Sequence, residues 1–171
     1  LTGSISIFGS TQPFYNLVVS SANQRYSNQN LVVEGNLTVD GGSLFNGNGE
    51  GSLIINTTGD VVIAESGSGT LGGNGATGAH YFGSLTINSG GTYAATTGTT
   101  TITSETVGGF AINHDGTLNN NTGIFNVTTV DATLLDLTGT GNLNDLVMNS
   151  SSTASIVDTT TIDGDLNISS G

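Results

Sequence analysis

The chain contains no cysteine and only one basic side chain, Arg25, against 13 Asp and Glu residues, so its formal net charge is −12. The absence of cysteine excludes a disulfide framework, a thiolate nucleophile and a zinc–thiolate site. A nucleic-acid-binding protein neutralises phosphates with many Lys and Arg side chains, and attraction to an anionic membrane surface needs them as well. We therefore expect neither a nucleic acid nor a membrane among the partners of this chain.

Long apolar runs and helical periodicity are missing too. No stretch approaches the roughly 18 apolar residues of a membrane-spanning helix, and Gly and β-branched Thr interrupt every window that would suit a helix. More than half of the residues are Gly, Ser, Thr or Asn. Val, Ile, Leu and Phe recur between them in short alternating runs bounded by turn-forming residues, a pattern that predicts β-strands.

The sequence repeats itself. Residues 14–42 and 143–171 align without a gap, and within them Val33–Val39 falls on Ile162–Ile168. A degenerate third copy begins at Phe82. Internal repeats of this kind are typical of repeat architectures. We therefore expect one domain over residues 1–171, with three repeat units that start near 14, 82 and 143.

A shorter element lies inside these units: one apolar residue, any residue, then a second apolar residue. It occurs at 17/19, 37/39, 53/55, 85/87, 110/112, 125/127, 146/148 and 166/168. Period-2 alternation directs the two apolar side chains inward and the middle one outward. The residue that follows each element is a polar one suited to a turn or to a ladder of stacked side chains, and we assign that role to Ser20, Asp40, Asn56, Asn88, Asn113 and Asn149.

Strands this short bury their apolar face only by stacking on one another, about 4.8 Å apart. The sequence therefore predicts an all-β fold, a right-handed parallel β-solenoid of about 8–9 coils with about 16–25 residues in each coil. Tandem antiparallel sandwiches are the alternative fold. They are disfavoured because their turn signals come about every 8–12 residues.

The runs FYNLVV, NLVVEGNLTVDGGSL, GSLTINSGGTY and TIDGDLNISSG resemble β-helical repeats of very long bacterial and archaeal cell-surface proteins of the adhesin type. Phage fibre proteins carry similar runs. The resemblance implies an extracellular structural or adhesive role at a cell surface or a virion surface. It implies no active site, because the motifs that carry it are architectural.

Catalytic and metal-binding interpretations are weaker than structural ones. Glycosidases use two acids that flank the sugar bond, and Asp163 and Asp165 would project to the same face of a strand. The first repeat has Glu34 and Asn36 at these positions, so we interpret them as corner residues. We expect no enzyme activity and no cofactor. Structural calcium in the acidic loops is the alternative, and the candidate loops are Asn46–Glu50, Asp40–Gly41 and Asp115–Gly116.

The remaining candidates are histidines, tyrosines and glycosylation sequons. We expect His80 and His114 at the surface or at corners of the coil. Sugar stacking is left open for Tyr15, Tyr26, Tyr81 and Tyr93. Six Asn-x-Ser/Thr sequons are possible N-glycosylation sites: Asn36, Asn56, Asn120, Asn126, Asn149 and Asn167.

Together these observations predict a non-catalytic structural protein, an extracellular solenoid that forms a stalk or filament of a cell-surface appendage and serves adhesion. A phage tail fibre or spike shaft that binds host glycans is one alternative, and a carbohydrate-active β-helix enzyme is another. The expected partners are copies of the chain stacked end to end or flanking repeats of the same polypeptide, with surface glycans as a further possibility.

Overall fold

The structure is a computed structural model that describes residues 5–7, 13–20, 22, 24–27, 29–46, 53–72, 77–131, 133–151 and 153–169. These residues form eighteen strands and no helix, so none of them belongs to a helix that could cross a membrane. Every strand pairing among them is parallel. The predicted all-β parallel solenoid is confirmed.

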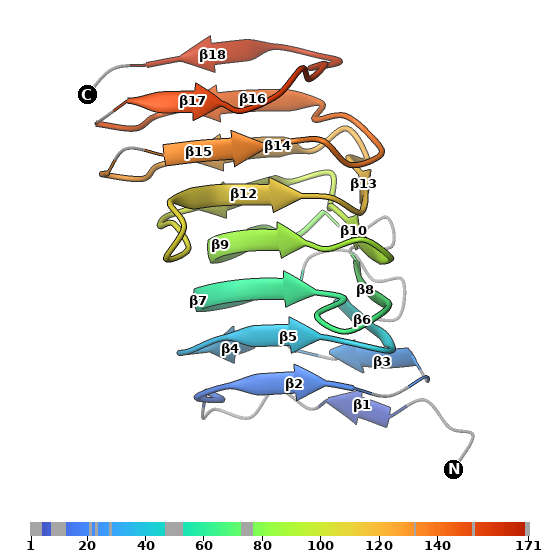
Figure 1. Ribbon diagram of the computed structural model, residues 1–171. Coiled ribbons are helices and arrows are strands. Elements are labelled where there is room, and N and C mark those ends of the chain that lie inside the picture. The colour runs from blue at the N-terminus through green and yellow to red at the C-terminus, as the bar shows by residue number, and fades with distance from the viewer. Residues whose placement is uncertain are drawn as a thin grey trace.

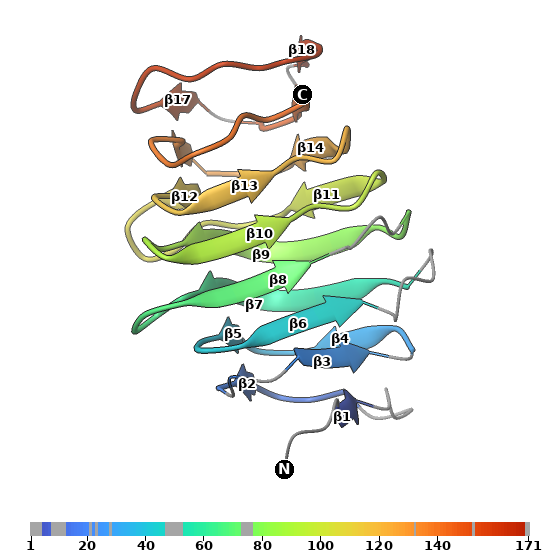
Figure 2. The ribbon, with the colours of Figure 1, turned by 90° about the vertical axis from the view of Figure 1, so that its right-hand side faces the viewer.

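Each coil passes along three faces, which we call front, side and back from their places in Figure 1. The chain runs to the right along the front, turns through the side, returns to the left along the back, and rises toward the C-terminus (Figures 1 and 2). This winding is right-handed, as predicted.

The side face is a six-stranded sheet. Its strands are β1 (Ile5–Ile7), β3 (Gln24–Ser27), β6 (Ser43–Asn46), β8 (Gly69–Gly72), β10 (Gly91–Ala94) and β13 (Thr117–Asn119).

A twelve-stranded sheet forms the front and back faces. The front strands are β2 (Leu17–Val19), β5 (Leu37–Val39), β12 (Phe110–His114), β15 (Thr133–Asp136) and β17 (Ala154–Ile156). The back strands are β4 (Leu31–Val33), β11 (Thr99–Ile102), β14 (Ile124–Val127), β16 (Asp145–Met148) and β18 (Leu166–Ile168). The long strands β7 (Ile55–Ile63) and β9 (His80–Ile87) belong to both faces, because each runs from the back to the front.

The number of coils differs from the prediction. The front column joins Leu17, Leu37, Val61, Leu85, Ile112, Leu135 and Ile156, which makes six coil-to-coil steps of 20 to 27 residues. The expected 8–9 coils of about 16–25 residues therefore become about six longer ones. The reason is that a single coil carries one apolar triplet on the back and another on the front, and counting each triplet as a coil overestimates the number.

Two of the predicted triplets are displaced. The strand near residue 53 begins at Ile55, and its inward pair is Ile55 and Thr57. In β12 a bulge shifts the register between Phe110 and Ile112. The middle residue Ala111 is buried there and does not face outward.

The apolar core runs along the solenoid between the three faces. Most of its large side chains are fully buried, among them Leu37, Leu85 and Phe125. The side sheet contributes one large buried side chain from most of its strands: Leu44, Leu71, Tyr93 and Leu118. Each coil thus covers the apolar residues of the coil before it.

Candidate functional site

The last two coils of the described chain reproduce the strand pairing and several backbone hydrogen bonds of the first two. Leu17 pairs with Leu37 on the front face, and their repeat equivalents Leu146 and Leu166 pair in the same way on the back face. The backbone bonds from Glu34 N to Phe14 O, Leu17 N to Asn36 O and Asp40 N to Val19 O recur as Asp163 N to Leu143 O, Leu146 N to Asp165 O and Ser169 N to Met148 O, all between 2.8 and 3.0 Å. The repeat detected in the sequence is therefore a local two-coil module that can occupy either face.

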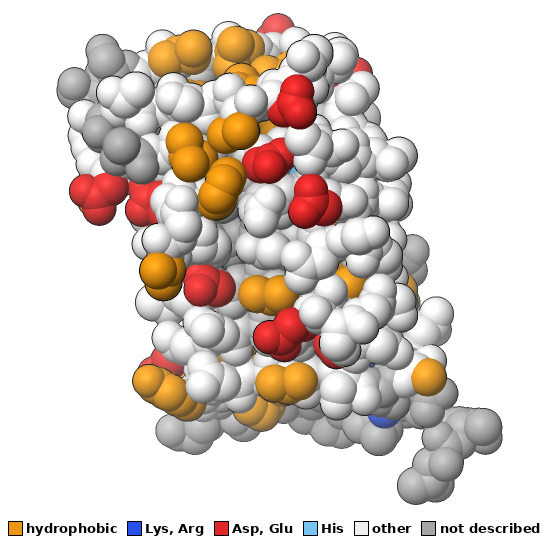
Figure 3. All heavy atoms as spheres, in the orientation of Figure 1, with side chains coloured by type: hydrophobic (Ala, Val, Ile, Leu, Met, Phe, Trp, Pro, Cys, Tyr) orange, Lys and Arg blue, Asp and Glu red, His pale blue; other side chains and the backbone are white. Residues whose placement is uncertain are grey.

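The two modules differ in what covers them. Leu37 and Val39 are fully buried, because β7 of the next coil lies on β5. Leu166 and Ile168 are 51% and 72% exposed, because no described strand lies beyond β18. Hydrophobic atoms lie at the top of the molecule in Figure 3, which is the C-terminal end of the solenoid.

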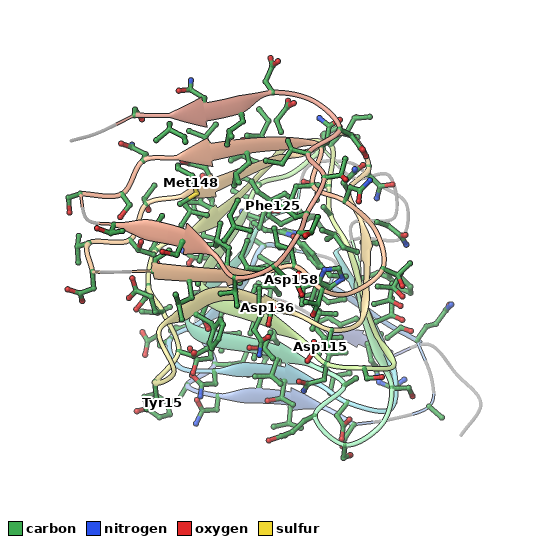
Figure 4. The ribbon with its side chains drawn as sticks, turned by 45° about the horizontal axis from the view of Figure 1, so that its top comes forward. Tyr15, Asp115, Phe125, Asp136, Met148 and Asp158 are labelled. Carbon is green, nitrogen blue, oxygen red and sulfur yellow. The ribbon has the colours of Figure 1, made fainter. Side chains whose placement is uncertain are left out.

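We call residues 154–169 the C-terminal edge. Ile156 and Val157 add to its exposed apolar surface at 44% and 52%. A hollow of about 210 Å³ opens into this edge, and Leu146, Met148 and Ile168 are among the residues that line it. Figure 4 views this end of the solenoid and labels Met148 and Phe125, which both belong to the apolar core. The open apolar end of the solenoid is the strongest candidate for an interaction surface.

The edge also presents backbone and side-chain acceptors. In the first module Gly35 O accepts from Gly59 N at 3.0 Å, Asn36 Oδ1 from Asp60 N at 3.0 Å and Val39 O from Ala64 N at 2.9 Å. The equivalent atoms of the second module are Gly164 O, Asp165 Oδ1 and Ile168 O. They stand where a further coil would donate to them.

A ladder of polar side chains runs up the corner between back and front. Asn36 N donates to Asn16 Oδ1 at 2.7 Å, Asp60 N to Asn36 Oδ1, and Ser84 Oγ to Asp60 Oδ1 at 2.7 Å. The second module repeats the first rung, since Asp165 N donates to Asp145 Oδ1 at 2.8 Å. The sequence pattern predicted ladder residues after each strand, whereas the residues of this ladder precede the strand. The signal for it was a Gly followed by Asn, Asp or Ser before the apolar triplet.

A second ladder occupies the edge of the side sheet. Asn142 Nδ2 donates to Asp163 Oδ1 at 2.9 Å, and Asn120 Nδ2 donates to Asn142 O at 3.0 Å and to Asp163 Oδ2 at 3.3 Å. These residues line a shallow polar hollow together with Asn121 and Thr122. The Asn side chains of this ladder donate to a carboxylate and to a backbone carbonyl, and they are not the residues predicted from the sequence.

The six predicted turn or ladder residues lie in different environments. Asp40 accepts hydrogen bonds from Ser66 N at 3.0 Å and from Ser66 Oγ, and these bonds lower the pKa of its carboxyl. Asn149 Oδ1 accepts from Ser169 Oγ at 3.5 Å. Ser20 and Asn88 lie outside strands. Asn56 and Asn113 lie inside β7 and β12, so the turn position expected for them does not hold.

The six sequons divide by exposure. Four of them have exposed side chains: Asn36, Asn56, Asn149 and Asn167. Asn120 and Asn126 are partly buried. Asn120 belongs to the polar ladder, and the buried Oδ1 of Asn126 has no hydrogen-bond partner. The exposed four are therefore the sites at which a glycan could attach without disturbing the coil.

His80 is buried in the core, so its expected surface position is wrong. It occupies the back column between Ile55 and Thr100, where the other members are apolar except Thr100. Tyr93 reaches both from the side sheet, with its hydroxyl 2.7 Å from His80 Nδ1 and 2.8 Å from Thr100 Oγ1. Burial lowers the pKa of His80 to about 3 and raises the pKa of Tyr93 above its ordinary value. The buried Tyr93 is not available to stack on a sugar.

His114 is likewise buried. Burial lowers its pKa, while the nearby carboxylates of Asp115 and Asp136 act in the opposite direction. Both histidines fill core positions. Tyr15 and Tyr81 remain exposed, and the Tyr26 side chain lies outside the described residues.

The acidic side chains are distributed along the outside. Asp115, Asp136 and Asp158 come from successive coils near one edge of the front face (Figure 4). The described residues contain no group of three or more His, Cys, Asp or Glu side chains arranged to hold a metal ion. Thr138 Oγ1 donates to Asp115 Oδ1 at 3.0 Å. Of the other predicted calcium loops, Asp40 is bonded to Ser66, and residues 47–50 lie outside the described residues. Asp163 accepts from Asn120 and Asn142, and Asp165 N donates to Asp145 Oδ1.

No protein-family model matches this chain, and no curated protein and no solved structure matches it either.

Proposed function

We propose that this chain is a non-catalytic structural protein, an extracellular β-solenoid shaft that forms part of a stalk or filament of a cell-surface appendage and serves adhesion. The observation that carries the proposal is the continuity of the ladders. The front column runs from Leu17 to Ile156 and the back column from Leu31 to Leu166 without a missing partner. Because each coil stacks on the one before it, a solenoid of this kind extends along one axis.

The composition supports the same role. Arg25 is the only residue after which a trypsin-like protease could cleave this sequence, an advantage on a surface exposed to proteases. Backbone groups inside the sheets bond to the neighbouring coils, so each coil holds the next in place. The resemblance of the repeats to those of long surface proteins points to a cell surface as the location.

The experiment is immunogold electron microscopy of intact producer cells and of their sheared surface appendages, with antibodies raised against the purified chain. The proposal predicts gold along extracellular fibres, and preincubation of the antibodies with the chain should abolish the label. Gold confined to the cell interior, or to virus particles, would contradict it. Label on virus particles would favour the phage-fibre alternative.

A further inference from the structure

We propose that the back face of the solenoid binds a neutral glycan chain, with the ring of Tyr81 as the surface on which a sugar stacks. The inference rests on the proposed adhesive function and names the class of ligand and its site. The strands concerned are β4, β11, β14 and the back halves of β7 and β9, which lie along the right-hand side of Figure 2.

Three outward side chains from successive coils form the centre of this face, and we call them the Tyr81 platform. Asn56 of β7 pairs with Tyr81 of β9, and Tyr81 pairs with Thr101 of β11. Adjacent strands are about 4.8 Å apart, so the platform spans about 10 Å along the axis. Tyr81 is 41% exposed, while its neighbours in the strand, His80 and Phe82, are buried in the core. The ring therefore stands on a backbone that the core holds in place.

The polar groups of the platform are free to bind a ligand. Within the described part of the chain, the side chains of Asn56, Tyr81 and Thr101 make no hydrogen bond. Other hydroxyls of the same face are used internally, since Thr103 Oγ1 donates to Phe82 O at 3.2 Å. An amide and two hydroxyls can both donate and accept hydrogen bonds. They match the hydroxyl groups of a sugar, which also do both.

The absence of charge on this face selects the class of ligand. No Asp, Glu, Lys or Arg occurs in β4, β11, β14, residues 55–57 of β7 or residues 80–82 of β9. The whole chain has a net charge of −12, which repels an acidic polysaccharide. A basic ligand would be attracted to the carboxylates elsewhere on the molecule. An aromatic ring with uncharged polar neighbours suits the C–H face and the hydroxyls of a neutral sugar.

Tyr15 is the other exposed tyrosine of the described residues, and it lies outside the platform. Its side chain is 75% exposed and precedes β2. Figure 4 shows it at the edge of the solenoid. Tyr15 therefore provides a matched control, because the same substitution can be made at an exposed tyrosine that does not belong to the proposed site.

The test is affinity electrophoresis in native gels that contain one neutral polysaccharide each: mannan, dextran, laminarin or galactan. The net charge of −12 drives the chain toward the anode, and binding slows it. The chain is produced in a host that attaches no N-glycan, because Asn56 belongs to a sequon and a glycan there would cover the platform. The proposal predicts retardation in at least one of these gels and none in a gel that contains polygalacturonate, an acidic polysaccharide.

Variants then assign the binding to the platform. Tyr81→Ala should weaken binding to the retarding polysaccharide about tenfold, whereas Tyr81→Phe keeps the ring and should retain most of it. Thr101→Val removes only a hydroxyl and should weaken binding about threefold. Tyr15→Ala should bind like the native chain. Thermal unfolding of each variant shows whether it is folded like the native chain.

The proposal would be overturned if no neutral gel retarded the native chain, if polygalacturonate alone retarded it, or if Tyr81→Ala and the native chain were retarded equally. Sedimentation without polysaccharide gives a further test. If the native chain dimerises and Tyr81→Ala stays monomeric, the platform is a contact between two copies, and the glycan proposal fails. In each case immunogold label on surface fibres would leave the proposed shaft function standing. Retardation that depends on Tyr81, with gold only inside the cell, would instead leave the glycan site and overturn the shaft.

Discussion

Leu37 and Leu166 occupy the same position in two copies of one sequence unit and pair with equivalent leucines of the preceding coil, yet one is fully buried and the other half exposed. Local sequence determines the strand, the corner and the turn. The neighbouring coil determines burial. In a solenoid most of the stabilisation of a coil therefore comes from its nearest neighbours.

This relationship gives a direct prediction about stability. Leu37→Ala should lower the free energy of unfolding by about 2–5 kcal/mol, because it leaves a cavity under β7. Leu166→Ala should lower it by less than about 1 kcal/mol in the monomer, because little buried area is lost. Denaturant unfolding of dilute protein measures both changes. Equal losses would mean that the C-terminal coil is already covered in the monomer.

The corner ladder makes a second prediction. A Cβ on Gly59 would lie 2.7 Å from Gly35 O and would also collide with Asn36 Oδ1, so Gly59→Ala should destabilise the protein by about 1–3 kcal/mol or more. Gly67→Ala is the control, because nothing lies within 4 Å of its added Cβ. That substitution should be neutral or slightly stabilising. Thermal unfolding of the two variants compares them, and similar melting temperatures would argue against a close-packed corner.

The buried His80 predicts loss of stability in acid. Folded His80 stays neutral down to pH about 3, whereas an unfolded histidine takes up a proton near pH 6.5. The contribution of His80 to the free energy of unfolding is therefore fully present above about pH 6.5. It falls as the pH drops toward 3, with a loss of the order of 4 kcal/mol from this residue. Denaturant unfolding at a series of pH values measures the slope.

The matched variant replaces the whole network: His80→Phe, Tyr93→Phe and Thr100→Val, so that no polar partner is left alone. Its stability should depend less steeply on pH between 6.5 and 3. The remaining slope belongs to carboxylates such as Asp40, whose lowered pKa acts in the same direction, and to His114. An unchanged slope would show that His80 is not the source.

Self-association should depend on the inward residues of β18. Ile168→Asp places a charge where a docked coil would bury it and should keep the chain monomeric. Asn167→Asp adds the same charge one residue away, at the outward position of the same strand, and should leave association nearly unchanged. Sedimentation velocity over a concentration series distinguishes them.

Association of the native chain should also increase with salt, because salt screens repulsion between acidic chains. A decrease with salt would indicate ionic contacts instead.

Much of the fold could be predicted from the sequence because the apolar triplets of a solenoid recur along the chain at the spacing of its strands. The triplets at 17/19, 37/39, 85/87 and 146/148 all lie in strands. The spacing from Leu17 to Leu85 is three whole coils, so both lie in one front column. The spacing to Leu146 is not a whole number of coils, and that unit moves to the back face. No sequence pattern distinguishes the two faces, which is why the coil count was too high.

The polar interior could not be predicted. His80, Tyr93 and Thr100 come from three strands, and only the register of the coils brings them together. The corner ladder was accessible in principle, since Gly35-Asn36, Gly59-Asp60 and Gly164-Asp165 precede their strands in the same way. The burial of Leu37 and the exposure of Leu166 required the structure, because the two residues are indistinguishable by sequence pattern.

The central claim is that this chain is a shaft that continues along its axis, and cryo-electron microscopy of the concentrated protein tests it most directly. The account predicts filaments with a strand spacing of about 4.8 Å and an axial repeat of about 38 Å. The back column has seven coil steps from Phe14 to Ile168 within one chain, and an eighth step leads to the next copy. The Ile168→Asp chain prepared in parallel should form none. Single particles of one chain at every concentration, or filaments whose subunits alternate in direction, would contradict the account.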